Sequence, residues 1–178
     1  MSLEIIVGPM FSGKTSYALT YINRLKAIGK RVLVIKPNID TRYSDDMVIV
    51  SHNNIRSESF VWDIRHPLVL TTDADHVVIE EAQFFKGLLD CVRKLLLIEK
   101  KNILLIGLDG DMNQNMFGEV LHCIPYCSKI TKLAAFCSIC KDGTLAYYTK
   151  AINRDMMDEQ IDIGGADKYI SVCLKHNG

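Results

Sequence analysis

The sequence predicts an α/β fold with a parallel sheet, followed by a small second lobe at the C-terminal end. Short apolar runs alternate with segments of helical spacing, and the middle runs are apolar on both faces, as buried parallel strands are. After about residue 133 the chain changes to cysteine pairs, glycine turns and short strand-like pieces, which predicts the lobe. We therefore expect two units, residues 1–133 and 134–178.

The first unit is expected to begin with a strand, a glycine-rich loop and a helix. Leu3 to Val7 is a short apolar run that ends at Gly8, and apolar residues then recur at helical spacing as far as Gly29. A polar stretch at residues 37–67 predicts a loop with a short hairpin. The remaining expected elements are strands at residues 31–36, 76–80, 102–108 and 129–136 and a helix at 88–99.

Composition limits the classes of partner. The 178 residues suffice for one substantial core with a small appended lobe. The 21 basic residues balance the 21 acidic ones, so no overall charge would hold nucleic acid or an anionic membrane. We expect neither partner, and any recognition of phosphate has to be local.

The N-terminal residues carry neither a basic leader nor an apolar run of membrane length, so we expect a cytoplasmic protein. Six cysteines could form a disulfide framework, but that pattern belongs to short secreted chains. Thiolates bound to a metal ion are the better expectation.

The first loop fits the phosphate-binding pattern G-x-x-x-x-G-K-[ST] and lies between a predicted strand and helix. Lys14 would reach the β- and γ-phosphates, and the Thr15 hydroxyl would bind Mg²⁺. The alternative is a glycine turn with a solvated lysine, which the strand–loop–helix setting disfavours. Backbone N–H groups along the loop would surround the phosphates of ATP, in the stretch formed by Gly8, Pro9, Met10, Phe11, Ser12 and Gly13.

Two carboxylates, Glu80 and Glu81, follow an apolar strand at the carboxyl edge of the sheet, where ligands of such folds bind. In an extended chain these side chains point in opposite directions. We therefore expect Glu80 to support Mg²⁺ and Glu81 to act as the general base toward an acceptor hydroxyl. The alternative is that both are ordinary strand-end acids in solvent.

Two ligand-like pairs near the C-terminus, Cys137 with Cys140 and Cys173 with His176, supply a Cys₃His set. Four protein ligands leave no open position, so the sequence predicts a structural Zn²⁺ site and not a catalytic one. The alternative is a reduced thiol pair with an incidental histidine. The other cysteines are expected to be buried small hydrophobic residues, namely Cys91, Cys123 and Cys127.

Four stretches together resemble the type II thymidine kinases, the zinc-containing class. They are GPMFSGKT at 8–15, DTRY at 40–43, EEAQFF at 80–85 and GGADKYISVC at 164–173. The resemblance implies a RecA-like P-loop core and a zinc lobe whose long lasso, around residues 152–169, closes over the base. It also implies that ATP phosphorylates the 5′-hydroxyl of thymidine, in a homotetramer that thymidine triphosphate inhibits.

The resemblance also implies roles for single residues. Glu81 would accept the proton of the 5′-hydroxyl, and Arg42 would position phosphate charge. Positions matching the thymine pocket are Met10, Phe84, Leu108, Phe117, Thr149 and Tyr169, and lasso positions that would read the base edges are Ile161, Asp162, Ile163, Gly164 and Gly165. The alternatives without a functional role are that Arg42 is a solvated loop residue, that Phe84 and Tyr169 pack in the core, and that residues 164–165 form a tight turn.

The sequence leaves two alternatives to this function. A P-loop ATPase that acts on nucleic acid would use the lobe as a contact module, but the chain has no basic stripe interleaved with aromatic residues. A binding protein without catalysis is disfavoured because Lys14, Thr15 and Glu81 are all present.

Overall fold

The computed structural model describes residues 1–38, 48–50, 56–152 and 168–178. At its centre lies a six-stranded sheet in which every neighbouring pair of strands is parallel. In spatial order the strands are β5 Phe60–Trp62, β2 Val32–Pro37, β6 His76–Ile79, β7 Asn102–Gly107, β1 Ser2–Val7 and β8 Lys129–Lys132. The predicted α/β fold with a parallel sheet is confirmed.

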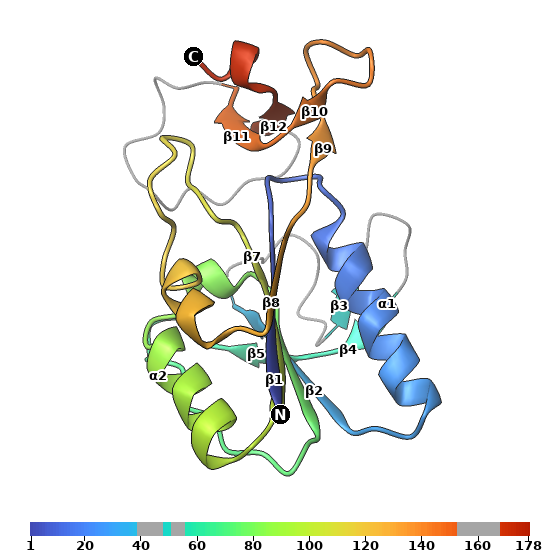
Figure 1. The fold of residues 1–178 in the computed structure, drawn as a ribbon, viewed down its shortest axis with the longest axis vertical. Coiled ribbons are helices and arrows are strands. Elements are labelled where there is room, and N and C mark those ends of the chain that lie inside the picture. Colours follow the sequence, from blue (N-terminus) through green and yellow to red (C-terminus); the bar gives the residue numbers. More distant parts are fainter. Residues whose placement is uncertain (39–47, 51–55, 153–167) are drawn as a thin grey trace.

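Helices cover both faces of this sheet (Figure 1). Helix α1, Lys14–Ala27, packs Ala18, Leu19 and Ile22 against one face. Helix α2, Leu88–Arg93, covers the other face and continues as a π-helical turn, η3 Lys94–Ile98. Because alternate residues of a strand point to opposite faces, strands covered on both faces are expected to be mostly apolar, and β6 and β7 are apolar after their first residues.

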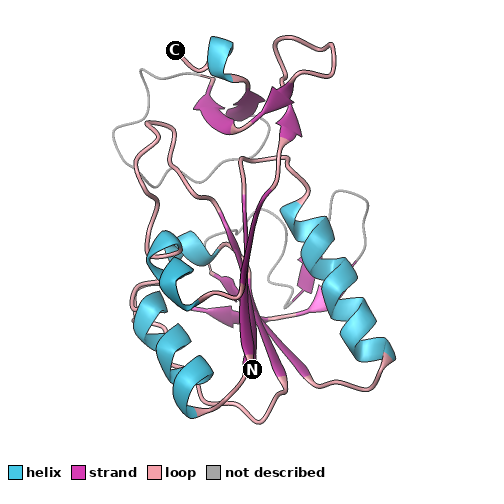
Figure 2. Ribbon diagram, in the orientation of Figure 1, coloured by secondary structure: helices cyan, strands magenta, loops and turns pink. Residues whose placement is uncertain are grey.

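The third group of buried residues lies in the C-terminal lobe, which sits beyond one end of the sheet (Figure 2). Its strands pair antiparallel, β9 Ala135–Phe136 with β10 Leu145–Ala146 and β11 Tyr148–Ala151 with β12 Tyr169–Val172. Its small core is separate from the two clusters that flank the sheet. The predicted lasso lies almost entirely outside the described residues.

The prediction of one continuous strand at residues 129–136 is wrong, because this segment forms two strands that belong to different sheets. Strand β8 ends at Lys132, and Leu133 donates one more main-chain hydrogen bond to Val7 at 2.8 Å before the chain crosses to β9. The run KITKLAAF contains no glycine or proline to mark the crossing. An uninterrupted β-prone run therefore predicted one strand.

The polar stretch after β2 contains the expected hairpin, β3 Val48–Val50 paired with β4 Arg56–Glu58. It also contains β5, which was not expected to join the main sheet but pairs parallel with β2 at its edge. With three residues and a half-exposed Phe60, this strand is too short to show a period of two.

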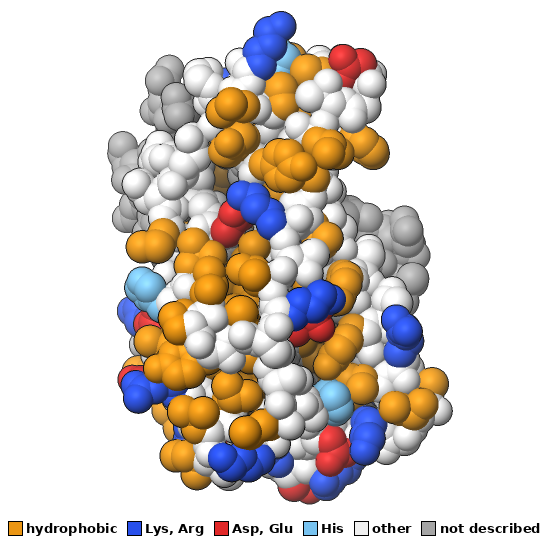
Figure 3. All heavy atoms as spheres, viewed as in Figure 1, with side chains coloured by type: hydrophobic (Ala, Val, Ile, Leu, Met, Phe, Trp, Pro, Cys, Tyr) orange, Lys and Arg blue, Asp and Glu red, His pale blue; other side chains and the backbone are white. Residues whose placement is uncertain are grey.

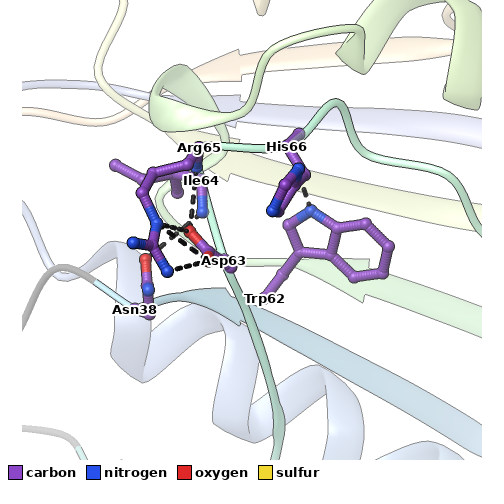
Figure 4. A network of polar contacts seen from close by, with 6 residues as sticks. All are labelled: Asn38, Trp62, Asp63, Ile64, Arg65 and His66. Carbon is purple, nitrogen blue, oxygen red and sulfur yellow. Dashed lines mark hydrogen bonds and ion pairs between the residues drawn. The ribbon is translucent and has the colours of Figure 1, made fainter.

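A polar network closes the turn after β5 (Figure 4). The Asn38 carboxamide accepts a hydrogen bond from the Ile64 N–H at 3.2 Å, and the Trp62 indole donates to the His66 carbonyl at 3.3 Å. The Arg65 guanidinium, hydrogen-bonded to Asp63, holds the pKa of that carboxyl well below its usual value. These polar groups form hydrogen bonds with one another, so we interpret the network as structural support for the edge of the sheet.

Cysteines outside the lobe pack in the core as predicted. Cys91 and Cys123 are buried, and Cys127 is half-buried against the same cluster. Burial raises the pKa of the Cys91 thiol to about 11 and that of Cys123 to about 12, which disfavours the reactive thiolate.

The surface of the described residues carries mixed charge. On the face that Figure 3 shows, basic and acidic side chains are interspersed among apolar ones. Among the described helices, none is long and apolar enough to cross a membrane.

Candidate functional site

The glycine-rich loop joins the end of β1 to the start of α1, at the carboxyl edge of the sheet. Gly8 has φ +149°, and a Cβ there would lie 2.5 Å from the Leu133 carbonyl oxygen, so only glycine fits. The Ser12 hydroxyl donates to the Pro9 carbonyl at 2.8 Å and closes the turn. The first turn of α1 contains no acidic residue, so its partly positive end is open to an anion.

Lys14, the first residue of α1, is buried beneath this loop. Its ammonium donates to the carbonyl oxygens of Gly8 at 3.1 Å and Pro9 at 2.7 Å. Burial lowers the pKa of Lys14, while the carboxylates of Glu81, Glu80 and Asp109 act in the opposite direction. The Lys14 ammonium therefore lies under the loop, where three acidic side chains interact with it electrostatically.

Glu80 lies just past the end of β6 and is buried, 4% exposed. Its Oε1 atom has no hydrogen-bond partner among the described residues. Burial raises the pKa of Glu80 to about 8, with a further contribution from Glu81 and an opposing one from Lys14. A buried carboxylate oxygen without a partner is costly, and carboxylate and hydroxyl oxygens are the ligands that Mg²⁺ prefers. The Glu80 carboxylate therefore fits that ion.

This burial predicts how stability depends on pH in protein free of magnesium and nucleotide. The carboxyl of Glu80 keeps its proton to about pH 8 in the folded chain but ionises near pH 4.5 when unfolded. The folded state therefore binds more protons in this window, and the free energy of unfolding falls as the pH rises through it. Urea denaturation at both ends of the window should show this fall in the wild type and a smaller one in Glu80→Gln. An equal fall in both proteins would contradict the prediction.

Glu81 differs from its neighbour in being only partly buried and in having a hydrogen-bond partner. Its backbone is left-handed, with φ 49° and ψ 44°, and it caps the short 3₁₀ turn η2, Ala82–Phe84. The predicted strand at 76–80 ends at Ile79, so a left-handed turn, and not extended chain, separates the two carboxylates. A non-glycine residue in this conformation costs about 1 kcal/mol, which is typical of functional turns.

Some of the candidate pocket residues lie together. The Phe84 and Phe117 rings pack edge to face with centroids 5.3 Å apart, which joins η2 to the segment after β7. In the lobe, the Thr149 hydroxyl accepts a hydrogen bond from the Met10 N–H at 3.0 Å. Leu108 follows β7, and Tyr169 is buried in β12. The predicted residues outside the described part of the chain are Arg42, Ile161, Asp162, Ile163, Gly164 and Gly165.

A residue that the sequence reading missed, Ser171, completes the connection between loop and lobe. Its hydroxyl donates to the Met10 carbonyl at 2.5 Å, so both polar groups of Met10 bond to the lobe. Ser171 pairs with Thr149 across β11 and β12 and shares a face of β12 with Tyr169. The alternation along this strand was the signal that could have identified it.

The four predicted metal ligands converge, because their ligand atoms all lie within 4.8 Å of one another. His176 Nδ1 lies 3.4 Å from the sulfurs of Cys140 and Cys173 and 3.6 Å from that of Cys137. The Cys140 and Cys173 sulfurs are 3.8 Å apart. Tetrahedral Zn²⁺ with Zn–S bonds of about 2.3 Å separates its sulfurs by about 3.8 Å, so the cluster can hold zinc.

Hydrogen bonds from the surrounding chain favour metal binding by this cluster. Burial raises the pKa of the Cys137 thiol, but hydrogen bonds from the N–H groups of Cys140, Cys173 and Ile139 outweigh it and lower the pKa overall. The Lys150 ammonium donates to the carbonyl oxygens of His176 at 2.8 Å and Gly178 at 3.0 Å, which fixes the last turn, η6 Leu174–His176.

Elemental analysis of the purified protein should return about one zinc ion per chain, because three thiolates and one imidazole satisfy tetrahedral Zn²⁺. Cys173→Ser should lose this zinc and unfold the lobe, whereas Cys91→Ser, at a cysteine outside the cluster, should keep it. A metal-free sample whose lobe is fully folded would contradict the prediction.

The thymidine kinase family model matches residues 1–177. A thymidine kinase of Choristoneura fumiferana entomopoxvirus is 35% identical and covers 97% of this chain and 94% of the relative. Thymidine kinase a of Arabidopsis thaliana is 38% identical, with 98% and 74% covered, and a thymidine kinase of Coprothermobacter proteolyticus is 36% identical, with 98% and 89% covered.

Proposed function

This chain belongs to the thymidine kinase family, and we propose that it transfers the γ-phosphate of ATP to the 5′-hydroxyl of thymidine. The observation that carries the proposal is the buried cation of Lys14, set beneath a glycine loop and within the field of the two carboxylates that follow β6. The core is then a RecA-like P-loop unit, residues 1–133, with a zinc lobe at 134–178.

ATP would lie with its phosphates over the loop. The N–H groups of the loop and of the start of α1 would surround the β-phosphate, apart from Pro9, which has none, and Met10, whose N–H bonds to Thr149. Lys14 would exchange contacts with loop carbonyls for contacts with phosphate oxygens. Glu80 and Thr15 would hold Mg²⁺. When bound, the ion neutralises charge on the β- and γ-phosphates.

The transfer itself needs positioning and one proton acceptor. The thymidine 5′-oxygen attacks the γ-phosphorus in line, a new O–P bond forms, and the bond to the bridging oxygen of ADP breaks. Glu81, whose carboxylate is only partly buried, would take the proton of the 5′-hydroxyl. Arg42 would support the phosphate charge in this step.

Thymine would be held between the core and the lobe. The Phe84 and Phe117 pair supplies an apolar wall, and Leu108, Met10, Thr149 and Tyr169 would supply the rest of the pocket. Backbone groups of residues 161–165 would read the base edges. The zinc ion would act structurally, because its four ligands leave no place for a substrate.

From the resemblance to the family, we propose that the chain assembles as a homotetramer and that thymidine triphosphate inhibits it. The alternative of an ATPase acting on nucleic acid is not favoured by the family membership.

The proposal is tested by measuring ADP formation from Mg²⁺ and ATP with either thymidine or single-stranded DNA added. Thymidine should stimulate ADP formation, and DNA should leave it at the background rate. Stimulation by DNA alone would favour the nucleic-acid ATPase and contradict the proposal.

A further inference from the structure

The side chain of Gln83 bridges the proposed base and the end of a neighbouring strand. Its Nε2 atom donates to Glu81 Oε2 at 2.7 Å, and its Oε1 atom accepts from the Leu108 N–H at 3.0 Å. Gln83 is 3% exposed, so both bonds are shielded from water. The carboxamide therefore connects η2, which carries Glu81, to the segment that follows β7.

The chemistry of the two partners fixes this amide in one orientation. An ionised carboxylate can only accept hydrogen bonds, and a backbone N–H can only donate one. Rotating the amide by half a turn would place like groups together at both ends, so the assignment of its oxygen and nitrogen is unambiguous. Asparagine is one methylene too short for this span, and glutamate lacks the donor.

The main chain of Gln83 packs closely against Gly118. Gly118 has φ +61°, and a Cβ at that position would lie 2.1 Å from the Gln83 carbonyl oxygen, so the two segments are too close for any side chain there. The Glu119 carboxylate, next along the chain, accepts from the N–H groups of Gly87 at 3.1 Å and Leu89 at 2.9 Å. Together these contacts join residues 81–89 to residues 108–119.

A half-exposed carboxylate on a short turn would otherwise sample several rotamers. The bond from a buried donor restrains Glu81 and engages its Oε2 atom. Among the described residues no hydrogen bond to Oε1 is found, so Oε1 is the oxygen that we assign to the proton. The other end of the same amide holds Leu108, a candidate for the thymine pocket. The Gln83 side chain therefore connects the proposed proton acceptor, Glu81, to a candidate residue of the thymine pocket, Leu108.

We propose that Gln83 is a positioning residue that aims Glu81 Oε1 at the acceptor hydroxyl and sets its place relative to the nucleoside pocket. This inference rests on the proposed function, because it acts through the same base. Losing the donor would misplace the carboxylate, and a misplacement of about 1 Å can lower a rate by about 10²-fold.

The test is a double-mutant cycle between Gln83→Met and Glu81→Gln, read as kcat and KM. Gln83→Met fills the same volume without either hydrogen bond. We expect it to lower kcat by about 10- to 100-fold and to leave the KM for ATP within about twofold of the wild type. In the Glu81→Gln background the same change should lower kcat by less than about twofold, because the group through which it acts is already gone.

A further variant separates positioning from loss of structure. Glu119→Ala loosens the same pair of segments without touching Glu81. Any rate loss it causes should be the same in the wild-type and Glu81→Gln backgrounds.

Failure of this inference can be told from failure of the proposed function. A wild type that does not phosphorylate thymidine, or a Glu81→Gln variant of normal rate, would overturn the assignment of the base and this inference with it. An active wild type with a slow Glu81→Gln variant, in which Gln83→Met is neutral or simply additive, would overturn only the role of Gln83.

Discussion

Replacing Lys14 with alanine should reduce thymidine phosphorylation by at least about 10³-fold, because the buried cation beneath the glycine loop is lost. The γ-phosphate would then lack its main positive contact apart from Mg²⁺. Two carboxylates would also remain without the opposing charge that Lys14 supplies. Both effects raise the free energy of the transition state.

A coupled assay of ADP formation with saturating thymidine measures this loss. Lys30→Ala is the matched control, since Lys30 is exposed at the turn after α1 and far along the chain from the loop. The control should keep nearly full activity. Normal turnover in Lys14→Ala, with the fold checked by circular dichroism, would refute the assignment of the loop.

Glu81→Gln should lower kcat by about 10²- to 10⁴-fold while the KM for ATP changes little. The amide has the same shape and can still accept the hydrogen bond from Gln83 through its oxygen, but it cannot take up a proton. The effect should therefore fall on the chemical step and not on nucleotide binding.

Single-turnover kinetics with preformed enzyme and ATP isolate that step. Asp73→Asn, the same change of acid to amide at an exposed ion pair with Arg31, is the control and should be neutral. A Glu81→Gln variant that reaches the wild-type rate would place the proton acceptor elsewhere.

The parts of the fold that the sequence predicted best are those whose signals are local. The β1–loop–α1 unit follows from glycines at fixed positions and an apolar helical period, and the two ligand pairs of the metal cluster come from their spacing. In both cases the chemistry requires particular residue types at particular positions.

The features that the sequence reading missed depend on contacts between distant segments. The role of the Gln83 amide is visible only in the folded chain, where the end of β7 brings the Leu108 N–H within hydrogen-bond distance. The role of Ser171 likewise depends on the fold, because β12 brings its hydroxyl to the Met10 carbonyl. Strand β5 is too short for its period to be read, and its place is set by pairing with β2. The left-handed Glu81 was likewise hidden, because nothing in its own residue type requires that conformation.

Burial explains why adjacent carboxylates can take different roles. Glu80 is enclosed and has an oxygen without a partner, which suits a metal ion, while Glu81 is accessible and held by a donor, which suits proton transfer. The sequence placed both acids at the sheet edge. Their environments, which separate the roles, come from the turn that follows β6.

The most direct test of phosphoryl transfer to a nucleoside alcohol follows the γ-phosphate of labelled ATP in the presence of Mg²⁺ and thymidine. The label should appear in thymidine monophosphate, with one ADP formed for each labelled product, and 5′-deoxythymidine, which lacks the acceptor hydroxyl, should take up none. Label found only in inorganic phosphate, or transferred equally to 5′-deoxythymidine, would contradict the account.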